Sequence, residues 1–356
     1  MLVSAIKREW PLFVGLLLLV ASSIYLKRLP HYHLEDFKVV YTLWVFLLIV
    51  KGLSRSGFFQ RAALFVERGR FPSLKMVLFA FFLSMFVTND VALFVVVPTT
   101  LLLDLGTYEK LFTVVGETLA VNIGSSLVPF GNPQNLYLYF HFNYSFGEFL
   151  KAIYPLVLGL FVLLVPFFVI GVETVQVKVK KVNYEPFQGT VYLLFLFLFA
   201  VSVVGFLPLW VGLLVPIFAL LFDRETLKVD YFLLLTFLVF FGFTDNVGNF
   251  LKEVPLKGEN EIFWSAVLGS QIFSNVPTAL LLGGLLNPSY KDALLWGVNV
   301  GGFGTLIASM ANLIAYRLYI KGENKEILAL VVFHIAGFLF LAVGVLLWYI
   351  AKGSGS

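Results

Sequence analysis

The chain has 356 residues, of which 60% are hydrophobic and 13% charged, and its mean hydropathy is +0.92. Soluble globular chains are nearer half apolar and a quarter charged, so the composition excludes an ordinary soluble domain and predicts an all-α polytopic membrane protein. The net charge of +4 comes from basic residues scattered through short loops, which indicates topology signals and no nucleic-acid partner. The chain has no Cys, which excludes disulfides and zinc–thiolate sites.

Seven uninterrupted apolar segments predict plain membrane helices, because about 20 apolar residues span the hydrocarbon core. Residues 12–26 resemble the core of a signal peptide, but no small-x-small cleavage site precedes Lys27-Arg28, so a retained first helix is predicted. The Gly-Ser-Gly-Ser at 353–356 is interpreted as a cloning tail. In chain order the seven segments are 11–28, 36–53, 149–171, 187–204, 208–222, 230–246 and 326–350.

Polar or glycine-rich sequence interrupts four further apolar segments. They are 76–103, broken at Thr88-Asn89-Asp90; 109–140, broken at 122–135; 262–286, broken at Ser274-Asn275; and 289–320, broken at 299–305. The order occurs twice, because "TND" precedes "NIGSSLVPFGNPQN" as "SNVPT" precedes "NVGGFGT". Asn89 corresponds to Asn275 at an offset of 186 residues, and Asn122 to Asn299 at 177, which indicates an internal repeat.

The distribution of Lys and Arg predicts the orientation of this repeat. If 76–103 and 262–286 are re-entrant hairpins and the N-terminus is cytoplasmic, 17 of the 25 basic residues lie on the cytoplasmic side. If both segments cross the membrane, only 14 do. The count therefore favours hairpins. In the hairpin model each repeat makes four crossings and one extra helix crosses between the repeats, so the second repeat is inverted relative to the first. The prediction is nine crossings plus two hairpins in the cell (inner) membrane, with the C-terminus outside.

This topology divides the chain into two similar units, and inverted repeats with discontinuous helices are typical of secondary transporters. The predicted units are a first repeat, 1–172, with hairpin 76–103 and broken helix 109–140; a cytoplasmic linker and extra crossing helix, 173–204; and a second repeat, 205–352, with hairpin 262–286 and broken helix 289–320.

The interruptions contain residues suited to helix ends. Asn132-Pro133 has the form of a helix cap followed by a first-turn Pro. Non-helical backbone at membrane depth is tolerated only where protein buries it or it lines a wet cavity, so the four breaks are expected to meet at one site. Helix N-termini there suit an anion, and helix C-termini suit Na⁺. The alternative is kinked helices with small-residue packing.

Two acids are candidates for a proton relay. Asp90 is the only carboxylate predicted near mid-membrane in the hairpins, and it carries a proton, helps to bind a cation, or caps a helix. Its counterpart in the second repeat is Val276, so a symmetric site does not require an acid. Glu117 relays protons, orients the first loop, or makes a structural hydrogen bond. Asp245 is expected to be solvated or to cap a loop, and Arg55 to extend to the membrane surface.

The motif "NIGSSLVPFGNPQN" (122–135) resembles the signature N-I-G-G-T-x-x-x-x-G-D-P-P-N of the ion transporter superfamily. That group includes arsenite-efflux permeases, NhaD-type sodium/proton antiporters, citrate permeases and divalent anion/sodium symporters. "TNDVALFVVVP" and "GNPQNLYLY" resemble citrate-transporter-like members, and "FSNVPTALLL" resembles the Ser-Asn-Thr motifs of dicarboxylate symporters, with Val276 in place of Thr. The signature has Gly, Thr, Asp and Pro where this chain has Ser125, Ser126, Asn132 and Gln134.

The resemblance implies a homodimer in which a transport domain moves against a scaffold by an elevator mechanism. It implies that hairpin tips and broken-helix loops bind coupling cations and substrate. The candidate substrate-binding residues are Thr88, Asn89, Asp90, Asn132, Asn135, Ser274, Asn275 and Thr278. The candidate Na⁺ ligands are Asn89, Asn122, Gly124, Ser125, Ser126, Asn275, Asn299, Gly301, Gly302 and Thr305.

The predicted function is secondary active transport of a small anion, a di- or tricarboxylate, coupled to Na⁺ or H⁺ by alternating access. The alternatives are a Na⁺/H⁺ antiporter or an arsenite or other oxyanion efflux permease, resting on Asp90 and Glu117, and, in a different class, a passive ion channel. Since the spans contain no HExxH, GxSxG or other catalytic pattern, we expect no enzyme activity, and no cofactor beyond the coupling ion.

Overall fold

The computed structural model describes residues 10–59, 61, 69–103, 105–169, 174–175, 184–250, 258–322 and 325–353. Most of the predicted linker before residue 184, and residues 354–356 of the predicted tail, lie outside these ranges. Some of the basic residues counted for the topology also lie outside them, namely Lys7, Arg8, Arg68, Lys178, Lys180, Lys181, Lys252 and Lys257.

The first half of the chain contains helices at all the predicted segments. They are α2 (Trp10–Leu26), α3 (Leu34–Arg55), α5 (Pro72–Phe86), α6 (Asn89–Leu102), α7 (Thr107–Ser126), α8 (Pro133–His141) and α9 (Phe146–Val169). Two short strands, β1 (Gly69–Arg70) and β2 (Thr174–Val175), pair antiparallel.

The second half of the chain also has helices at all the predicted segments. Its α-helices are α10 (Pro186–Val203), α11 (Leu214–Phe222), α12 (Tyr231–Phe250), α13 (Glu259–Phe273), α14 (Asn275–Gly283), α15 (Lys291–Gly301), α16 (Met310–Gly322) and α17 (Glu326–Gly353). Its 3₁₀ helices are η1 (Leu209–Leu213), η2 (Arg224–Leu227), η4 (Pro288–Tyr290) and η5 (Leu306–Ala308).

The predicted interruptions fall between consecutive helices, but their bounds differ from those indicated by the sequence: the first three are narrower, and the fourth begins and ends later. Asn122 and Asn299 remain helical, within α7 and α15, because their side chains bond across to other helices and the helix backbone continues past them. The actual breaks are Val87-Thr88, 127–132, Ser274 and 302–309.

Five helical stretches among the described residues are long and apolar enough to cross a membrane. They are Leu34–Arg55, Phe146–Val165, Pro186–Val203, Arg224–Val247 and Glu326–Gly353. Shorter apolar helices occupy Leu12–Leu26, Pro72–Phe86, Asn89–Leu102 and Leu209–Phe222. The protein is therefore polytopic, while the count of nine crossings and the inverted repeat stay predictions.

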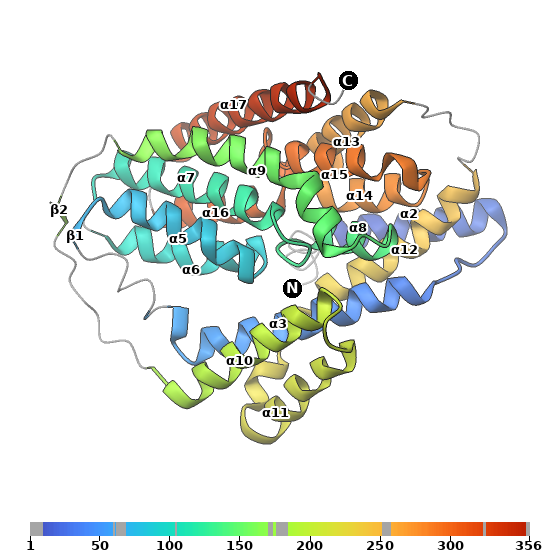
Figure 1. The fold of residues 1–356 in the computed structure, drawn as a ribbon, viewed down its shortest axis with the longest axis horizontal. Helices are drawn as coiled ribbons and strands as arrows, with labels where there is room; N and C mark the ends of the chain where they lie inside the picture. The colour runs from blue at the N-terminus through green and yellow to red at the C-terminus, as the bar shows by residue number, and fades with distance from the viewer. Residues whose placement is uncertain are drawn as a thin grey trace.

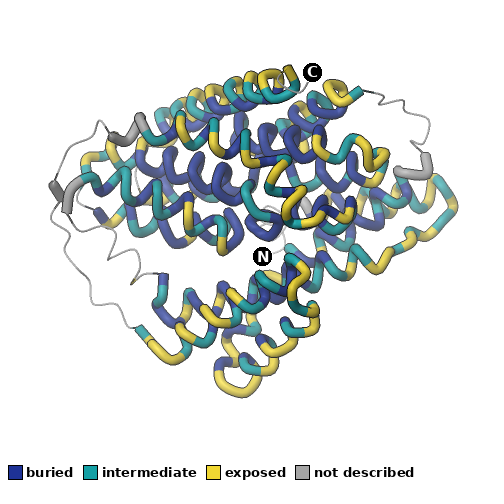
Figure 2. The backbone as a smooth tube through the Cα atoms, viewed as in Figure 1, coloured by how far each residue is buried: buried dark blue, intermediate teal, exposed yellow. Residues whose placement is uncertain are grey.

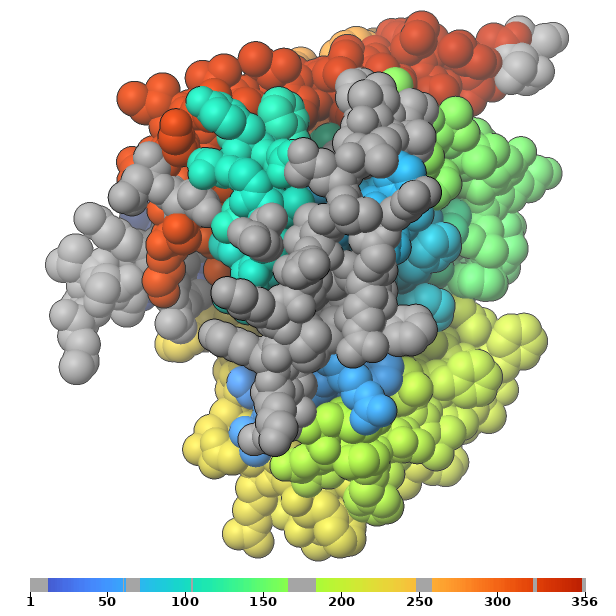
Figure 3. Space-filling model, turned by 90° about the vertical axis from the view of Figure 1, so that its left-hand side faces the viewer, coloured from blue at the N-terminus to red at the C-terminus, as the bar shows by residue number. Residues whose placement is uncertain are grey.

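The hairpins and the broken helices together form two groups of helices (Figure 1). α17 lies along the top of the molecule in Figure 1, α5, α6, α7 and α16 lie beneath it on one side, and α13, α14, α15 and α8 on the other. α3, α10 and α11 form the opposite edge (Figures 1 and 3). α2 packs along α12, and α3 along α10.

The two hairpins contact the broken helices in the same way. α5 packs against α7, and α13 against α15, so the first arm of each hairpin lies along the first half of the broken helix that follows it. The second arms are exchanged, because α6 packs against α16 and α14 against α8. Each hairpin therefore bridges both broken helices.

The centre of the molecule is the pair α7 and α15. Every residue from Thr113 to Ser126 in α7 and from Ala293 to Gly301 in α15 is buried (Figure 2). Since the helix ends next to the breaks belong to this core, protein surrounds the interrupted backbone.

Two ion pairs join the halves of the chain at the ends of α3 and α12. Arg28, after α2, pairs with Asp245 near the end of α12, and Arg55, at the end of α3, pairs with Asp223 after α11 at 3.2 Å. Asp245 also accepts a hydrogen bond from the backbone N–H of His31, which confirms that it caps a loop. Arg55 reaches a protein carboxylate, so the simple expectation of a side chain extending to the membrane surface was incomplete.

Candidate functional site

The first hairpin is held on the first broken helix at its tip. α5 ends at Phe86, and two extended residues turn the chain into α6, which begins at Asn89. The backbone N–H of Asn89 donates to the carbonyl of Gly131 at 3.1 Å, in the loop between α7 and α8. Thr88 and Asn89 are buried, and the Asn89 side-chain oxygen accepts from the N–H of Asp90 at 3.0 Å. Tip and loop thus form one unit.

The restart of the broken helix at α8 is capped as the sequence predicts. The side-chain oxygen of Asn132 accepts from the N–H of Asn135 at 2.9 Å, and Pro133 occupies the first turn. This satisfies a backbone donor that has no partner within the helix, and Pro has no N–H to leave unpaired. The cap is confirmed, and the Asn132 side chain is committed to it.

The second hairpin has an equivalent tip. Ser274 turns the chain with φ +74° between α13 and α14, and the hydroxyl of Thr278 donates back to the Ser274 carbonyl at 2.8 Å. The Asn275 side-chain amide lies against Gly302, where an added Cβ would be 2.9 Å from its nitrogen. The tip of the second hairpin therefore contacts the second broken loop.

Glycine allows each hairpin to lie close to its broken helix. A Cβ at Gly124 would lie 2.2 Å from the Phe81 carbonyl and 2.5 Å from the Ser84 hydroxyl. A Cβ at Gly301 would lie 2.7 Å from the Ser270 hydroxyl. The two glycines are 177 residues apart and the two serines 186, the same offsets as the asparagine pairs of the repeat.

Four buried asparagines connect the two broken helices. The Asn122 amide donates to the side-chain oxygen of Asn312 at 2.7 Å, and the Asn299 amide donates to that of Asn135 at 2.8 Å. Asn135 and Asn312 are also 177 residues apart, so the two hydrogen bonds join pairs of residues that share this sequence offset. The residues near the four breaks are therefore brought together, as the sequence predicts.

Two hydroxyls complete this network. Ser126 donates to the side-chain oxygen of Asn299 at 2.8 Å, and Ser309 donates to that of Asn122 at 3.3 Å. The sequence reasoning missed Asn312 and Ser309. Extending the repeat past Gly304 would have found them, because the 177-residue offset relates Asn132-Pro133-Gln134-Asn135 to Ser309-Met310-Ala311-Asn312.

The second loop contains a further residue that the sequence did not reveal. The Gln271 side-chain amide donates to the carbonyls of Gly301 at 2.7 Å and Phe303 at 3.0 Å, and its oxygen accepts from the N–H of Thr305 at 2.9 Å. The Asn312 amide donates to the carbonyls of Gly302 at 3.0 Å and Thr305 at 3.1 Å. Side-chain amides thus donate hydrogen bonds to four backbone carbonyls at the start of this loop.

The two acids lie at different depths of the α6–α7 contact. Glu117 is completely buried, and one carboxyl oxygen accepts a hydrogen bond from the Thr100 hydroxyl of α6. Its other oxygen and Oδ1 of Asp90 are buried without a hydrogen-bond partner among the described residues. Asp90 is in the first turn of α6, where the helix dipole favours a negative charge.

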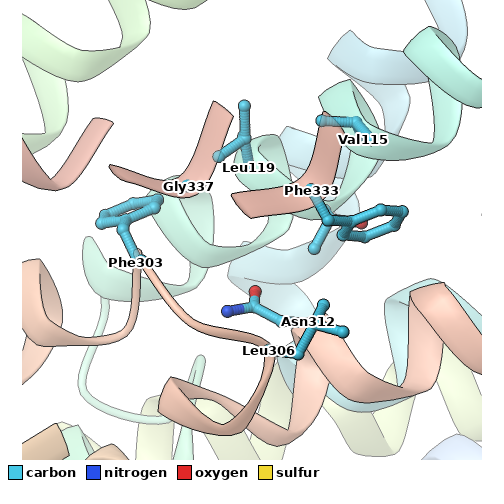
Figure 4. Close-up of a pocket in the computed structure, with 9 residues that line it drawn as sticks. Val115, Leu119, Phe303, Leu306, Asn312, Phe333 and Gly337 are labelled. Carbon is cyan, nitrogen blue, oxygen red and sulfur yellow. The ribbon is translucent and has the colours of Figure 1, made fainter. Parts of the chain in front are cut away.

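A small pocket lies behind the second loop (Figure 4). It is lined by Val115, Thr118 and Leu119 of α7, by the loop residues Phe303, Gly304 and Leu306, and by Asn312, Phe333 and Gly337. None of the candidate substrate-binding residues lines it. α17 seals this side closely, since a Cβ at Gly337 would lie 2.4 Å from the Gly304 carbonyl.

The donor set around the breaks suits a monovalent cation and an anion. The described residues contain no cluster of three or more His, Asp or Glu side chains that could hold a metal ion. Neutral carbonyl and amide oxygens gather at the ends of α7 and α15, and the N-termini of α6, α8, α14 and α16 begin at the breaks. Helix N-termini attract anions and helix C-termini attract cations.

The family can be decided from comparison with known proteins. A family model described as "Citrate transporter" (CitMHS) matches residues 1–291. The chain belongs to the citrate transporter family. This confirms the resemblance to the ion transporter superfamily, of which citrate permeases are part. Together with the apolar helices, it indicates a multi-pass membrane transporter.

Two relatives support that assignment. The "Uncharacterized transporter MJ0456" of Methanocaldococcus jannaschii is 33% identical over 325 residues, which cover 86% of this chain and 87% of that protein. "Inner membrane protein YbiR" of Escherichia coli (strain K12) is 36% identical over 316 residues, covering 80% of each chain. The citrate transporter family member described here therefore resembles them along most of its length.

Proposed function

We propose that this protein is a secondary active transporter that moves a small anion, a di- or tricarboxylate, across the membrane by alternating access, coupled to Na⁺ or H⁺. The observation that carries the proposal is the joining of the four breaks. Each hairpin tip contacts the loop of its own broken helix, and Asn122–Asn312 and Asn299–Asn135 connect the two broken helices. Interrupted helices that meet in the protein interior are typical of transporter binding sites.

The hairpin tips are the proposed substrate contacts. Thr88, Asn89 and Asp90 begin α6, while Ser274, Asn275 and Thr278 surround the start of α14. The partial positive charge at the N-termini of these two helices attracts carboxylates, and the side chains add directional hydrogen bonds. Asn132 and Asn135 act mainly by positioning the N-terminus of α8, because both are already hydrogen-bonded within the protein.

The proposed cation ligands are the oxygens around the first broken loop. Asn122, Gly124, Ser125 and Ser126 lie at or near the end of α7, where the helix dipole is negative, and Asn89 begins α6 and is hydrogen-bonded to Gly131 in the loop after α7. Binding of a cation between the hairpin tip and this loop stabilises the N-terminus of α6 in the position that holds the anion. Cation and anion then increase each other's affinity by the same factor.

The proposal includes the membrane arrangement. Two inverted repeats give nine crossings and two re-entrant hairpins, with the N-terminus cytoplasmic and the C-terminus outside. The exchanged packing of α6 on α16 and α14 on α8, and the matching Gly–Ser contacts, support the repeat. α2, α3, α10, α11 and α12 form the scaffold of a homodimer, against which the remaining helices move as an elevator.

Uptake into proteoliposomes tests the proposal. Citrate, succinate and a panel of other small anions are offered with inward Na⁺ or H⁺ gradients to the wild type and to Asn89→Ala, Asn275→Ala and the control Asn287→Ala. Asn287 is exposed and only caps the short η4. We expect gradient-driven uptake that is lost in the first two variants and retained in the control. No gradient-driven flux with any anion rejects the proposal, and flux without coupling to a gradient identifies a channel.

A second candidate is Na⁺/H⁺ antiport or oxyanion efflux. One oxygen each of Asp90 and Glu117, buried and without a hydrogen-bond partner in the described part of the chain, favours it, because buried acids in membrane proteins commonly carry protons. Addition of Na⁺ to liposomes without any anion substrate distinguishes the two. Proton movement that Asp90→Asn or Glu117→Gln abolishes supports antiport. No proton movement supports anion symport.

A further inference from the structure

The two broken helices occupy matching places in the predicted repeat, but the backbone carbonyls of their loops have different hydrogen-bond partners. Each first half, α7 or α15, ends inside the protein and leaves carbonyls without intrahelical donors. Such carbonyls carry partial negative charge and need either a cation or a hydrogen-bond donor. Which of these each loop uses sets how many cations the transporter binds.

In the second loop, N–H groups of the protein already donate hydrogen bonds to these carbonyls. The two hydrogens of the Gln271 amide point at the carbonyls of Gly301 and Phe303, at 2.7 and 3.0 Å. The loop is closed around the same side chain, because its oxygen accepts from the N–H of Thr305 and the Thr305 hydroxyl donates to the Gln271 carbonyl at 3.2 Å. Gly304 has φ +102°, and a Cβ there would lie 2.3 Å from the Gln271 oxygen.

A second amide completes the set. Asn312 donates to the carbonyls of Gly302 and Thr305, at 3.0 and 3.1 Å. Its side chain reaches toward the loop after Phe303 in Figure 4. Four carbonyls between residues 301 and 305 therefore accept hydrogen bonds from two neutral side chains.

The first loop has no donor in the corresponding position. The 186-residue offset that relates Asn89 to Asn275 places Met85 opposite Gln271. Methionine has no N–H or O–H, so it cannot satisfy carbonyls. Among the described residues, the side-chain donor to a carbonyl of this loop or of the last residue of α7 is Asn135, which bonds to the Ser126 carbonyl at 3.2 Å.

We propose that the Gln271 side-chain amide takes the place of a coupling cation in the second loop, so that the transporter binds a cation at the first loop alone. The proposal rests on the cation-coupled form of the proposed function. Chemically, the amide is a covalently attached, uncharged substitute for Na⁺ that holds the α15 loop and the second hairpin in the same geometry as a bound ion. The Na⁺ roles predicted for Gly301, Gly302 and Thr305 are then filled by hydrogen bonds.

The test compares Gln271→Met, which copies the first repeat, and Gln271→Glu, which keeps the shape but directs a carboxylate at the loop carbonyls. Gln188→Met, on α10 and remote from both loops, is the matched control. The thermal midpoint of the purified full-length protein is measured in NaCl and in choline chloride. Initial rates of substrate uptake are measured against Na⁺ concentration.

For the wild type and the control we expect a Hill coefficient for Na⁺ of about 1, since it cannot exceed the number of coupled sites. At least one Gln271 variant is expected to gain Na⁺-dependent stabilisation beyond the wild type, with its Hill coefficient rising toward about 2 if it transports. If Gln271→Met does not fold, the Gln271→Glu variant provides the measurement.

The inference is overturned if the wild type has a Hill coefficient near 2, or if no folded Gln271 variant gains a Na⁺ response. Its failure is distinguishable from that of the proposed function. A wild type that ignores Na⁺ but whose Gln271 variants respond to it supports Gln271 as the substitute and rejects the cation site at the first loop. Absence of any substrate flux rejects the transport proposal, while the thermal measurement still decides the role of Gln271.

Discussion

Substituting Gly124 with Ala tests whether the close contact between α5 and α7 sets the position of the first hairpin. The new Cβ would lie 2.2 Å from the Phe81 carbonyl, where ordinary contact begins near 3.4 Å, so the helices have to separate by about 1 Å. Overpacking of this kind costs about 1–3 kcal/mol. Because the hairpin tip is joined to the loop by the Asn89–Gly131 hydrogen bond, we expect the separation to weaken that bond and reduce transport.

The repeat supplies a sharper version of this test. At Gly301 the obstacle is the Ser270 side chain at 2.7 Å, with the nearest backbone oxygen at 3.1 Å. Gly301→Ala should therefore be largely rescued by Ser270→Gly. Gly124→Ala should not be rescued by Ser84→Gly, because the Phe81 backbone carbonyl remains in the way. The prediction separates side-chain crowding from backbone crowding within one molecule.

The thermal midpoint in detergent and the rate of uptake in proteoliposomes check both substitutions. The matched control is Gly147→Ala in the first turn of α9, where a Cβ has nothing within 4 Å and should be neutral or slightly stabilising. The reasoning is refuted if Gly124→Ala behaves like this control, or if Ser84→Gly restores it as fully as Ser270→Gly restores Gly301→Ala.

Three further predictions concern polar contacts between helices, of which the first two join the halves of the chain. A double-mutant cycle of Asn299→Ala and Asn135→Ala should give a coupling free energy of about 1 kcal/mol, measured from unfolding in mixed detergent, because the 2.8 Å hydrogen bond is buried; additive effects would contradict it. Arg55→Asp and Asp223→Arg should each lower the thermal midpoint and the double exchange should recover part of the loss, whereas a double exchange no better than the single variants would show that the ion pair is not what joins α3 to α11. Glu117→Gln should fold with a midpoint near that of the wild type, because the amide oxygen still accepts from the Thr100 hydroxyl, but should flatten the dependence of uptake on the H⁺ gradient; an unchanged H⁺ dependence would exclude Glu117 from coupling.

The positions of the helix breaks followed from the sequence because their residues stand out against apolar surroundings. Clustered polar, Gly or Pro residues in an apolar run indicate a broken helix, so the breaks near 88, 127–132, 274 and 302–309 were placed to within a few residues. The Asn132-Pro133 cap was recognisable for the same local reason. Asn312 escaped notice because it lies inside α16, without a Gly or Pro beside it to indicate an interruption.

The sequence by itself determined that the protein is polytopic and α-helical and that four of its helical segments are interrupted, and it predicts that the interruptions form a repeat. These are properties of local composition and order, and the membrane makes them strict, because unpaired backbone groups in lipid are too costly. Only the tertiary structure decided which partner each polar group takes. The exchange of α6 and α14 between the broken helices, the pairing of Asn122 with Asn312, and the closure of the second loop by Gln271 depend on contacts between distant segments, and residue order alone does not specify those contacts.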